Sequence, residues 1–372
     1  MVKKETLWPC KPRTKSKLKI VSNYLGAWFG ILAKNGFKHV IYIDGFCGPG
    51  EYTTREEGSP VIAARIANST AQKSPGFKAT LFFVDKNSKV LQHLKSTNAI
   101  KNLHPNVDVQ IKEGVFAQEI DSILLYLKKN PKSPTFSFID PRGFGQSPFE
   151  KLKPLMHNES SELFINFMCG FMNRFKEHKD EKVIQKIKEM VGSDDLTAII
   201  NANDPIDKLC EVYETKLKSL GEYTFKVSMR DEGNVRDNTF FFCGRQLLGF
   251  QKIKEAMWKI DPEHGNSFSA HGELKKSAPQ KDFFDEPEPQ TSKLSSLLIQ
   301  HYAGEKDVPI EDIFRWVTEE TAFLPTHARM ELENLCERGQ ITYRDPSNIG
   351  RKRRRNTWAD GWLISFKERP PP

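Results

Sequence analysis

The feature that most constrains the fold is a repeated alternation of short apolar segments with amphipathic segments over the first half of the chain. Five segments have the length and the β-branched and aromatic content of buried strands: 39–44, 81–85, 107–111, 135–140 and 163–168. Apolar positions at a period close to 3.6 residues predict helices around them: 17–32, 61–67, 89–94, 120–127 and 149–156. Strands that are apolar on both faces and alternate with helices form a parallel sheet covered on both sides.

Two further strand-like segments follow a helical region at about 179–219. Residues 223–229 and 238–243 are separated by the polar sequence Asp231-Glu232-Gly233-Asn234, which is typical of a hairpin. Five parallel strands finished by an antiparallel pair are the arrangement of the class I methyltransferase sheet. The sequence therefore predicts an α/β, Rossmann-like fold of this class over residues 1–260.

The rest of the chain has a different character. Residues 261–291 are rich in Pro, Gly, Ser and acidic residues, and we interpret them as a linker. Beyond them, three amphipathic segments at 294–302, 310–317 and 327–335 precede two strand-like segments at 341–343 and 358–366. Three helices followed by a two-stranded wing predict a winged-helix domain over residues 292–372.

The net positive charge of the chain is concentrated in this last region. The net charge of the chain is +8, and residues 341–372 carry eight basic and three acidic side chains, so they alone contribute +5. In a winged helix the third helix enters the major groove, which makes His327 and Arg329 candidates for base contact. The run Arg351, Lys352, Arg353, Arg354 and Arg355 would be a wing on the phosphate backbone. A solvated charge run or a localisation signal is the alternative interpretation.

Composition excludes several classes of protein. No stretch of 18 apolar residues occurs, and the N-terminus lacks the apolar segment of a signal peptide, so we expect a cytoplasmic protein without a membrane partner. The six cysteines are scattered without a CxxC pair, which argues against a zinc ribbon or a disulfide framework. We therefore predict no metal site.

A glycine-rich loop follows the first predicted strand, with the sequence Asp44-Gly45-Phe46-Cys47-Gly48-Pro49-Gly50. In open parallel sheets the ligand lies beyond the carboxyl ends of the strands. A dinucleotide site would need a third glycine where the chain has Thr53, so the spacing favours S-adenosylmethionine over NAD. The predicted cofactor-binding residues are Asp44, Phe46, Gly48, Gly50, Asp85 for the ribose and Glu113 for the adenine. Strand capping and turn formation are the structural alternative for Asp44 and Asp85.

The fourth predicted strand ends in Asp140-Pro141-Arg142-Gly143-Phe144. In amino-methyltransferases this position holds a carboxylate or amide and a backbone carbonyl that orient the target nitrogen, with an aromatic ring stacked on the base. We predict these roles for Asp140, Pro141 and Phe144, and a tight Pro-Gly turn is the structural alternative. Cys169, after the fifth strand, is a less favoured candidate for a cytosine-attacking nucleophile.

Several of these motifs together resemble one family. Tyr42-Ile43-Asp44-Gly45-Phe46-Cys47-Gly48-Pro49-Gly50, Glu57-Gly58-Ser59-Pro60, Phe138-Ile139-Asp140-Pro141-Arg142-Gly143, Leu163-Phe164-Ile165-Asn166-Phe167 and Met257-Trp258 look like the three-Cys-motif partner protein family, TcmP. The similarity covers roughly residues 10–265. It implies a methyltransferase-like fold, an S-adenosylmethionine cofactor and a partner protein with a three-cysteine, radical-enzyme-like motif.

The sequence thus supports three hypotheses about function. The first is an S-adenosylmethionine-dependent methyltransferase that acts on DNA or RNA, at the exocyclic amine of a base. The alternative is a non-catalytic nucleic-acid-binding partner of a radical-type three-cysteine protein, with an inherited methyltransferase-like fold. The third is a small-molecule methyltransferase, for which the basic run would be irrelevant.

Overall fold

The computed structural model describes residues 6–171, 181–230, 236–269, 290–346 and 357–368. The chain divides into two compact units. The first comprises Met1–Ala256 and Ser267–Pro279, and the second comprises Met257–Asn266 and Gln280–Pro372. Among the described residues, none of the helices combines the length and the apolar character needed to cross a membrane.

The first unit is built on an eight-stranded sheet with the order β3-β2-β1-β4-β5-β7-β6-β8. The strands are β1 His39–Asp44, β2 Lys78–Asp85, β3 Val107–Glu113, β4 Thr135–Ile139, β5 Ser161–Phe167, β6 Tyr223–Arg230, β7 Arg236–Gly244 and β8 Ser267–Ser269. Strands β1 to β5 are parallel, and β7 is antiparallel to both β5 and β6. The predicted α/β fold is confirmed, because five parallel strands closed by an antiparallel hairpin are the class I methyltransferase arrangement.

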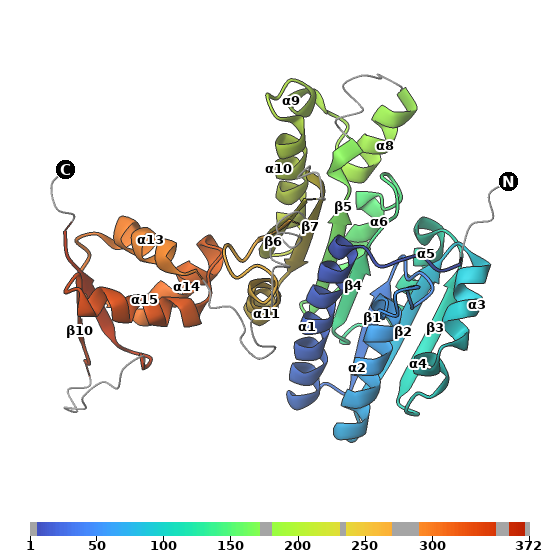
Figure 1. Cartoon of the computed structure of the whole chain (residues 1–372), viewed down its shortest axis with the longest axis horizontal. Helices are drawn as coiled ribbons and strands as arrows, with labels where there is room; N and C mark the ends of the chain where they lie inside the picture. The colour runs from blue at the N-terminus through green and yellow to red at the C-terminus, as the bar shows by residue number, and fades with distance from the viewer. Residues whose placement is uncertain (1–5, 172–180, 231–235, 270–289, 347–356, 369–372) are drawn as a thin grey trace. The chain divides into compact units, whose positions relative to one another are not determined.

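Helices cover both faces of this sheet (Figure 1). They are α1 Pro12–Lys34, α2 Ser59–Lys73, α3 Ser88–Ser96, α4 Asn98–Lys101, α5 Phe116–Lys129, α6 Phe149–Leu152, α8 Glu181–Val191, α9 Thr197–Ile200, α10 Pro205–Lys218 and α11 Leu247–Trp258. The helix expected at 149–156 is shorter than predicted. After α6 the chain continues as the 3-10 turn Lys153–Leu155, because Pro154 has no backbone N–H for an α-helical hydrogen bond.

Helix α1 shows how the local sequence sets these elements. Pro12 starts the helix, where its missing N–H costs nothing, and the chain leaves the helix at Asn35 and Gly36, which has φ +80°. The apolar side chains recur at helical spacing and are buried: Leu18, Ile20, Val21, Tyr24, Leu25, Trp28 and Phe29. This face packs on the sheet, where the rings of Tyr24 and Phe136 have centroids 4.9 Å apart.

The two faces of the sheet have separate cores. On one face, Ile41 and Ile43 of β1 join a cluster with Phe116, Ile120 and Ile123 of α5. On the other face, Tyr42 stacks on Phe136 with ring centroids 6.1 Å apart. Alternate residues of β1 therefore serve opposite cores, as the double-sided apolar pattern predicts.

Strand β8 was not foreseen by the sequence. The segment 261–291 was interpreted as a linker, but Ser267–Ser269 pairs in parallel with Ser228, Met229 and Arg230 of β6 and forms the edge of the sheet. Such short polar strands are held by main-chain hydrogen bonds to an open edge and leave little mark on hydrophobic periodicity. Residues 270–289 lie outside the described part of the chain.

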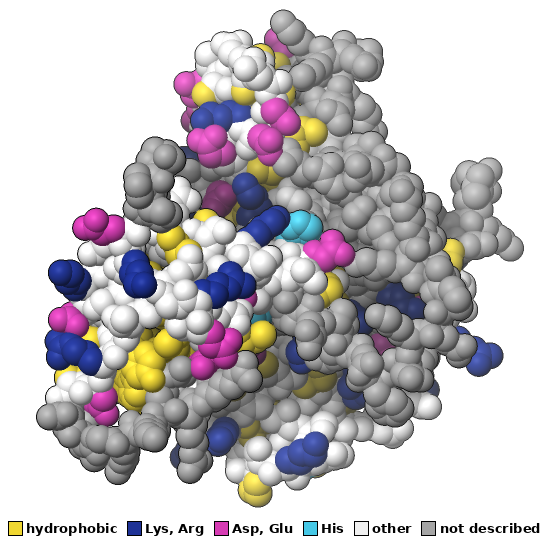
Figure 2. Space-filling model, turned by 60° about the vertical axis from the view of Figure 1, so that its left-hand side comes forward, with side chains coloured by type: hydrophobic (Ala, Val, Ile, Leu, Met, Phe, Trp, Pro, Cys, Tyr) yellow, Lys and Arg dark blue, Asp and Glu magenta, His cyan; other side chains and the backbone are white. Residues whose placement is uncertain are grey.

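The second unit consists of three helices and a small antiparallel sheet with the order β10-β11-β9. Its elements are α13 Ser292–Tyr302, β9 Val308–Pro309, α14 Ile310–Glu320, α15 Pro325–Glu337, β10 Ile341–Arg344 and β11 Leu363–Phe366. Its core holds Trp258, whose indole N–H donates to the carbonyl of Ala322 at 2.9 Å. Figure 2 shows acidic and basic side chains intermixed on the face that it draws, beside a group of hydrophobic side chains.

Candidate active site at the carboxyl ends of the strands

The first unit contains a cavity of about 450 Å³ at the carboxyl ends of β1, β4 and β5. This is the edge at which open α/β sheets bind ligands, and the volume is typical of a small-molecule site. Its walls come from the N-terminal segment and α1, the glycine loop after β1, the turn after β4 and the facing ends of β5 and β7. Predicted site residues that line it are Phe46, Gly48, Gly50, Asp140 and Pro141.

The glycine loop is held in place by backbone hydrogen bonds to neighbouring strands. The N–H of Gly45 donates to Phe138 at 3.0 Å, and the N–H of Cys47 donates to Val84 at 2.9 Å. Gly48 and Gly50 have φ values of +67° and +84°, which side chains rarely tolerate. A Cβ at Gly50 would also lie 2.7 Å from the Leu94 side chain. Both glycines are therefore required by the path of the loop.

Asp44 is fully buried beneath this loop and does not line the cavity. Its Oδ1 accepts the N–H of Phe46 at 3.2 Å, so the carboxylate fixes the first turn of the loop. Burial raises the pKa of Asp44 to about 7, against the opposing effect of the Ser59 hydrogen bond. The structure gives this carboxylate a supporting position behind the loop.

Asp85 lies at the end of β2, behind the loop, and is not among the described residues that line the cavity. Its two oxygens accept the N–H groups of Gly48 at 3.2 Å and Asn87 at 2.9 Å. The guanidinium of Arg142 is 3.8 Å from Asp85 Oδ2 and stacks on the Trp8 ring at 4.1 Å from its centroid. Arg142 thus links the turn after β4 with the N-terminal segment across the glycine loop.

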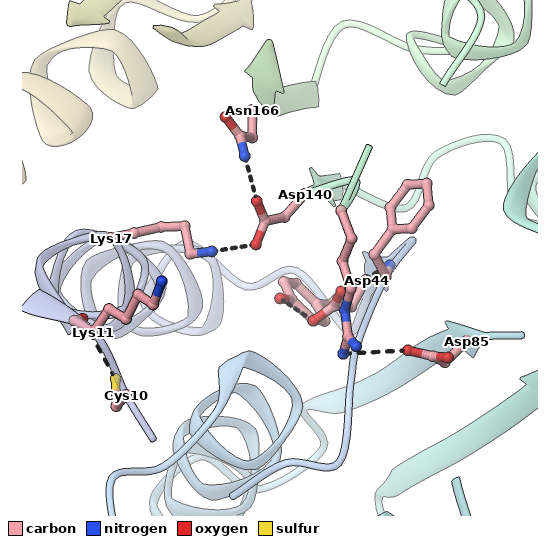
Figure 3. A network of polar contacts seen from close by, with 10 residues as sticks. Cys10, Lys11, Lys17, Asp44, Asp85, Asp140 and Asn166 are labelled. Atoms are coloured by element: carbon pink, nitrogen blue, oxygen red, sulfur yellow. Dashed lines mark hydrogen bonds and ion pairs between the residues drawn. The ribbon is translucent and has the colours of Figure 1, made fainter. Parts of the chain in front are cut away.

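Asp140 is the centre of a polar network inside the cavity (Figure 3). Its Oδ2 forms an ion pair with Lys17 Nζ from α1, and its Oδ1 accepts a hydrogen bond from Asn166 Nδ2 of β5 at 2.7 Å. Figure 3 shows Lys17 and Asn166 reaching Asp140 from two sides. Bonds to both a cation and an amide hold the carboxylate in one orientation.

Several residues of this site were not identified from the sequence. Lys11, Arg13 and Lys17 line the cavity, as does Asn238 of β7. The three cations could have been predicted from the sequence. Basic residues alternate with others from Lys11 to Lys19, where the apolar face of α1 begins. Asn238 gave no local signal, because only the pairing of β7 with β5 brings it to the cavity.

Other predicted residues are not brought to this cavity. Phe144 packs against the core beside α8, with Lys186 Nζ 5.9 Å from its ring centroid, and Glu113 is exposed at the end of β3. Neither lines the cavity. The structure therefore does not place Phe144 where the predicted stacking on a base in this cavity would need it. Cys169 is fully buried with its sulfur 3.5 Å from Thr239 Oγ1, which excludes an accessible nucleophile.

The residues predicted to contact nucleic acid in the second unit also differ in where the structure places them. His327 is only 4% exposed, and its ring contacts that of Trp258 with centroids 4.5 Å apart, so it belongs to the core and cannot reach a groove. Arg329 is partly exposed, with its guanidinium 4.6 Å from the centroid of Phe314. Arg351, Lys352, Arg353, Arg354 and Arg355 lie outside the described residues.

Comparison with known proteins adds the following. No protein family and no curated protein matches the sequence. A proposed caffeoyl-CoA O-methyltransferase from Staphylococcus aureus is similar in structure over 59% of this chain and 82% of its own, with 13% identity and a TM-score of 0.31. A proposed O-methyltransferase from Klebsiella pneumoniae is similar over 64% of this chain and 92% of its own, with 10% identity and a TM-score of 0.33. Similarity this weak carries no argument about activity, and the fold assignment rests on the strand order.

Proposed function

We propose that this protein is an S-adenosylmethionine-dependent methyltransferase that modifies nucleic acid at the exocyclic amine of a base. The observation that carries the proposal is one cavity, at the carboxyl ends of the strands, that brings together the glycine loop and the Asp140 network. The loop supplies a place for a cofactor, and the network supplies hydrogen-bond acceptors for an amine.

The residues of the loop fit the cofactor. Gly48 and Gly50 line the cavity, and their positive φ angles set the path of the loop along it. Behind the loop, the Asp85 carboxylate accepts the N–H groups of Gly48 and Asn87, so it holds the loop in the shape that the cofactor would contact. When bound, S-adenosylmethionine supplies a methyl group on a positively charged sulfur, which keeps the electron pair of the broken carbon–sulfur bond.

The turn after β4 suits an amine as acceptor of that methyl group. Asp140 is fixed by Lys17 and Asn166, and each carboxylate oxygen retains a lone pair for an N–H of the substrate. Accepting those N–H groups orients the nitrogen lone pair for attack on the methyl carbon. The surplus proton of the amine passes to water after transfer, so the site needs no separate general base.

Charge at the cavity supports a phosphate-bearing substrate. The charged residues that line it are Lys11, Arg13, Lys17 and Arg142 against Asp140 alone, so four cations and one anion give +3. Such a lining attracts a polyanion such as the phosphate backbone of a nucleic acid. As part of this proposal, the second unit is a winged-helix module that adds nucleic-acid affinity, since its helices and three-stranded sheet follow that order.

The proposal is tested by two measurements on the full chain. Calorimetry with S-adenosylmethionine should show binding that is weakened in Asp85→Ala, with Asp108→Ala on the exposed face of β3 as the matched control. Transfer of a labelled methyl group into pooled DNA and RNA, followed by nucleoside analysis, should then identify an N-methylated base. Nucleic-acid binding without any cofactor binding at millimolar concentration would instead favour the non-catalytic alternative.

A further inference from the structure

Two buried amide oxygens in the cavity have no hydrogen-bond partner among the residues that the structure describes. They belong to Asn166 of β5 and Asn238 of β7, whose residues are 5% and 4% exposed. Both residues line the cavity, and Oδ1 of each is without a partner among the described residues. Buried side-chain oxygens are nearly always hydrogen-bonded, so a pair of exceptions in one cavity requires an explanation.

The sheet register places the two amides on the same face. Asn166 pairs with Phe240 across the antiparallel β5–β7 ladder, and Asn238 precedes Phe240 by two residues. Side chains two residues apart on a strand share a face, so Asn166 and Asn238 are diagonal neighbours. Diagonal neighbours lie about 7 to 8 Å apart at Cα, within reach of one planar ligand.

The orientation of the Asn166 amide is fixed by its neighbour. The Asp140 carboxylate is paired with Lys17 and therefore accepts hydrogen bonds, so the nitrogen of the amide must face it. Figure 3 shows this nitrogen directed at Asp140. The unpartnered atom of Asn166 is thus an acceptor, and the cavity presents acceptors from Asp140, Asn166 and Asn238.

We propose, resting on the function proposed above, that these three acceptors select guanine and direct methyl transfer to its exocyclic N2. The Watson–Crick edge of guanine offers three N–H hydrogens on adjacent nitrogens, one on N1 and two on N2. The corresponding edges of adenine and cytosine offer only the two hydrogens of one amino group, which would leave a buried acceptor unpaired. An unpaired buried acceptor costs about 1 to 3 kcal/mol, which is the basis of the discrimination.

The charge of the cavity favours guanine over the arginine side chain, which is the other common group with adjacent N–H donors. An arginine side chain presents similar adjacent N–H donors, but it is a cation. The lining carries +3, so beside the cofactor's positive sulfur a neutral base attached to phosphates is favoured over a further cationic side chain. The step transfers a methyl group from sulfur to N2, forms one carbon–nitrogen bond, breaks one carbon–sulfur bond and releases the N2 proton to water.

The test compares single-stranded thymidine oligomers, and the matching uridine oligomers, that carry one central guanine, hypoxanthine, adenine or cytosine. Affinity for the full chain is measured by fluorescence anisotropy. Guanine should bind about tenfold more tightly than adenine and cytosine. Hypoxanthine lacks the N2 amino group and offers only the N1 hydrogen, so it should lose the whole of this preference.

The variant Asn238→Leu keeps the number and branching of the side-chain heavy atoms and removes the acceptor without changing Asp140. It should reduce the preference for guanine to within about threefold, because adenine no longer leaves a third acceptor unpaired and the affinity for adenine oligomers should rise. Ser137→Ala is the matched control, because Ser137 Oγ is also buried without a partner but does not line the cavity. This control should keep the full preference for guanine.

Equal affinity for all four oligomers in the wild type would overturn the inference, because water would then satisfy the two amides. Tighter binding of an arginine-containing peptide would overturn it as well. These failures are distinct from failure of the proposed function. Methylation of adenine or cytosine would remove the guanine assignment and keep the methyltransferase, whereas lack of cofactor binding in calorimetry would remove the methyltransferase itself.

Discussion

The two ends of strand β5 bury polar side chains on the same face of the sheet, but they satisfy them differently. At the amino end, Glu162 is 5% exposed, and its Oε2 accepts the hydroxyl of Tyr24 from α1 at 2.7 Å. Gly249 of α11 leaves room for this carboxyl, since a Cβ there would lie 1.9 Å from Glu162 Oε1. At the carboxyl end, Asn166 is equally buried, and within the described part of the chain its oxygen has no partner.

Under the function proposed above, this difference distinguishes Glu162, which serves the fold, from Asn166, which serves ligand binding. Glu162 has its donor supplied by the same helix, α1, that supplies Lys17 to the cavity. Because the fold satisfies Glu162 internally, nothing further is needed there. In the proposed function, the acceptors at the other end are satisfied by the bound base, which would offset the cost of leaving them unpaired in the free protein. Variants at the two ends of β5 should therefore differ in catalysis, in stability and in the pH dependence of stability.

The largest effect is expected on catalysis at the carboxyl end. Asp140→Ala should lower kcat/KM for methyl transfer by about 10² to 10³, because the amine loses the group that orients it. The affinity for S-adenosylmethionine should change by less than about threefold, since Asp140 lies outside the glycine loop. Single-turnover kinetics and calorimetry measure the two quantities.

The control for this prediction is Glu162→Gln, at the other end of the strand. It preserves the shape of the side chain and leaves the cavity untouched, so methyl transfer should continue at the wild-type rate. An equal loss of activity in both variants would show that the two ends of β5 are not functionally separate.

The free energy of unfolding should show the opposite order, with the larger loss at the amino end of β5. At pH 6, Glu162→Ala should lower the free energy of unfolding by about 2 to 4 kcal/mol, because it leaves a cavity and an unpaired buried Tyr24 hydroxyl. Asn238→Leu should be neutral or stabilising by up to about 1 kcal/mol, since it replaces an unsatisfied acceptor by an apolar group with the same branching. Urea denaturation of the two variants decides between these signs, and a large loss in Asn238→Leu would contradict the comparison.

The pH dependence of stability gives a third test. Burial raises the pKa of Glu162 from 4.5 to about 7 and that of Asp44 from 3.8 to about 7. The folded state therefore binds more protons than the unfolded state from about pH 4.5 to 7, and the free energy of unfolding should fall as pH rises through that window. Glu162→Gln should remove on the order of 1 to 3 kcal/mol of this fall. If the free energy of unfolding falls by the same amount in that variant, groups other than Glu162 cause the pH dependence.

What the sequence predicted depended on how local each signal was. Strand–helix alternation gave the order of elements, and the spacing of Asp44, Gly48 and Gly50 located the loop, because turn geometry is encoded in adjacent residues. Asn238 came to the cavity through pairing of β7 with β5, which no local pattern encodes. His327 was misplaced for the same reason, since its position at the start of α15 suggested exposure while Trp258 covers it.

The smallest effect is expected for the exposed contact at the mouth of the cavity. The Arg142 side chain is 51% exposed and its ion pair with Asp85 is 3.8 Å long, so solvent and salt screen it. Arg142→Ala should change the free energy of unfolding by less than about 1 kcal/mol, including its stacking on Trp8. Tyr24→Phe, which removes one buried hydrogen bond to Glu162, should cost about 1 to 3 kcal/mol and be insensitive to salt. Thermal denaturation of both variants at low and high salt measures this ranking. If Arg142→Ala proved the more costly, the Arg142 bridge between Asp85 and Trp8 would be part of the folded framework, and the division of β5 into a structural end and a ligand-binding end would have to be redrawn.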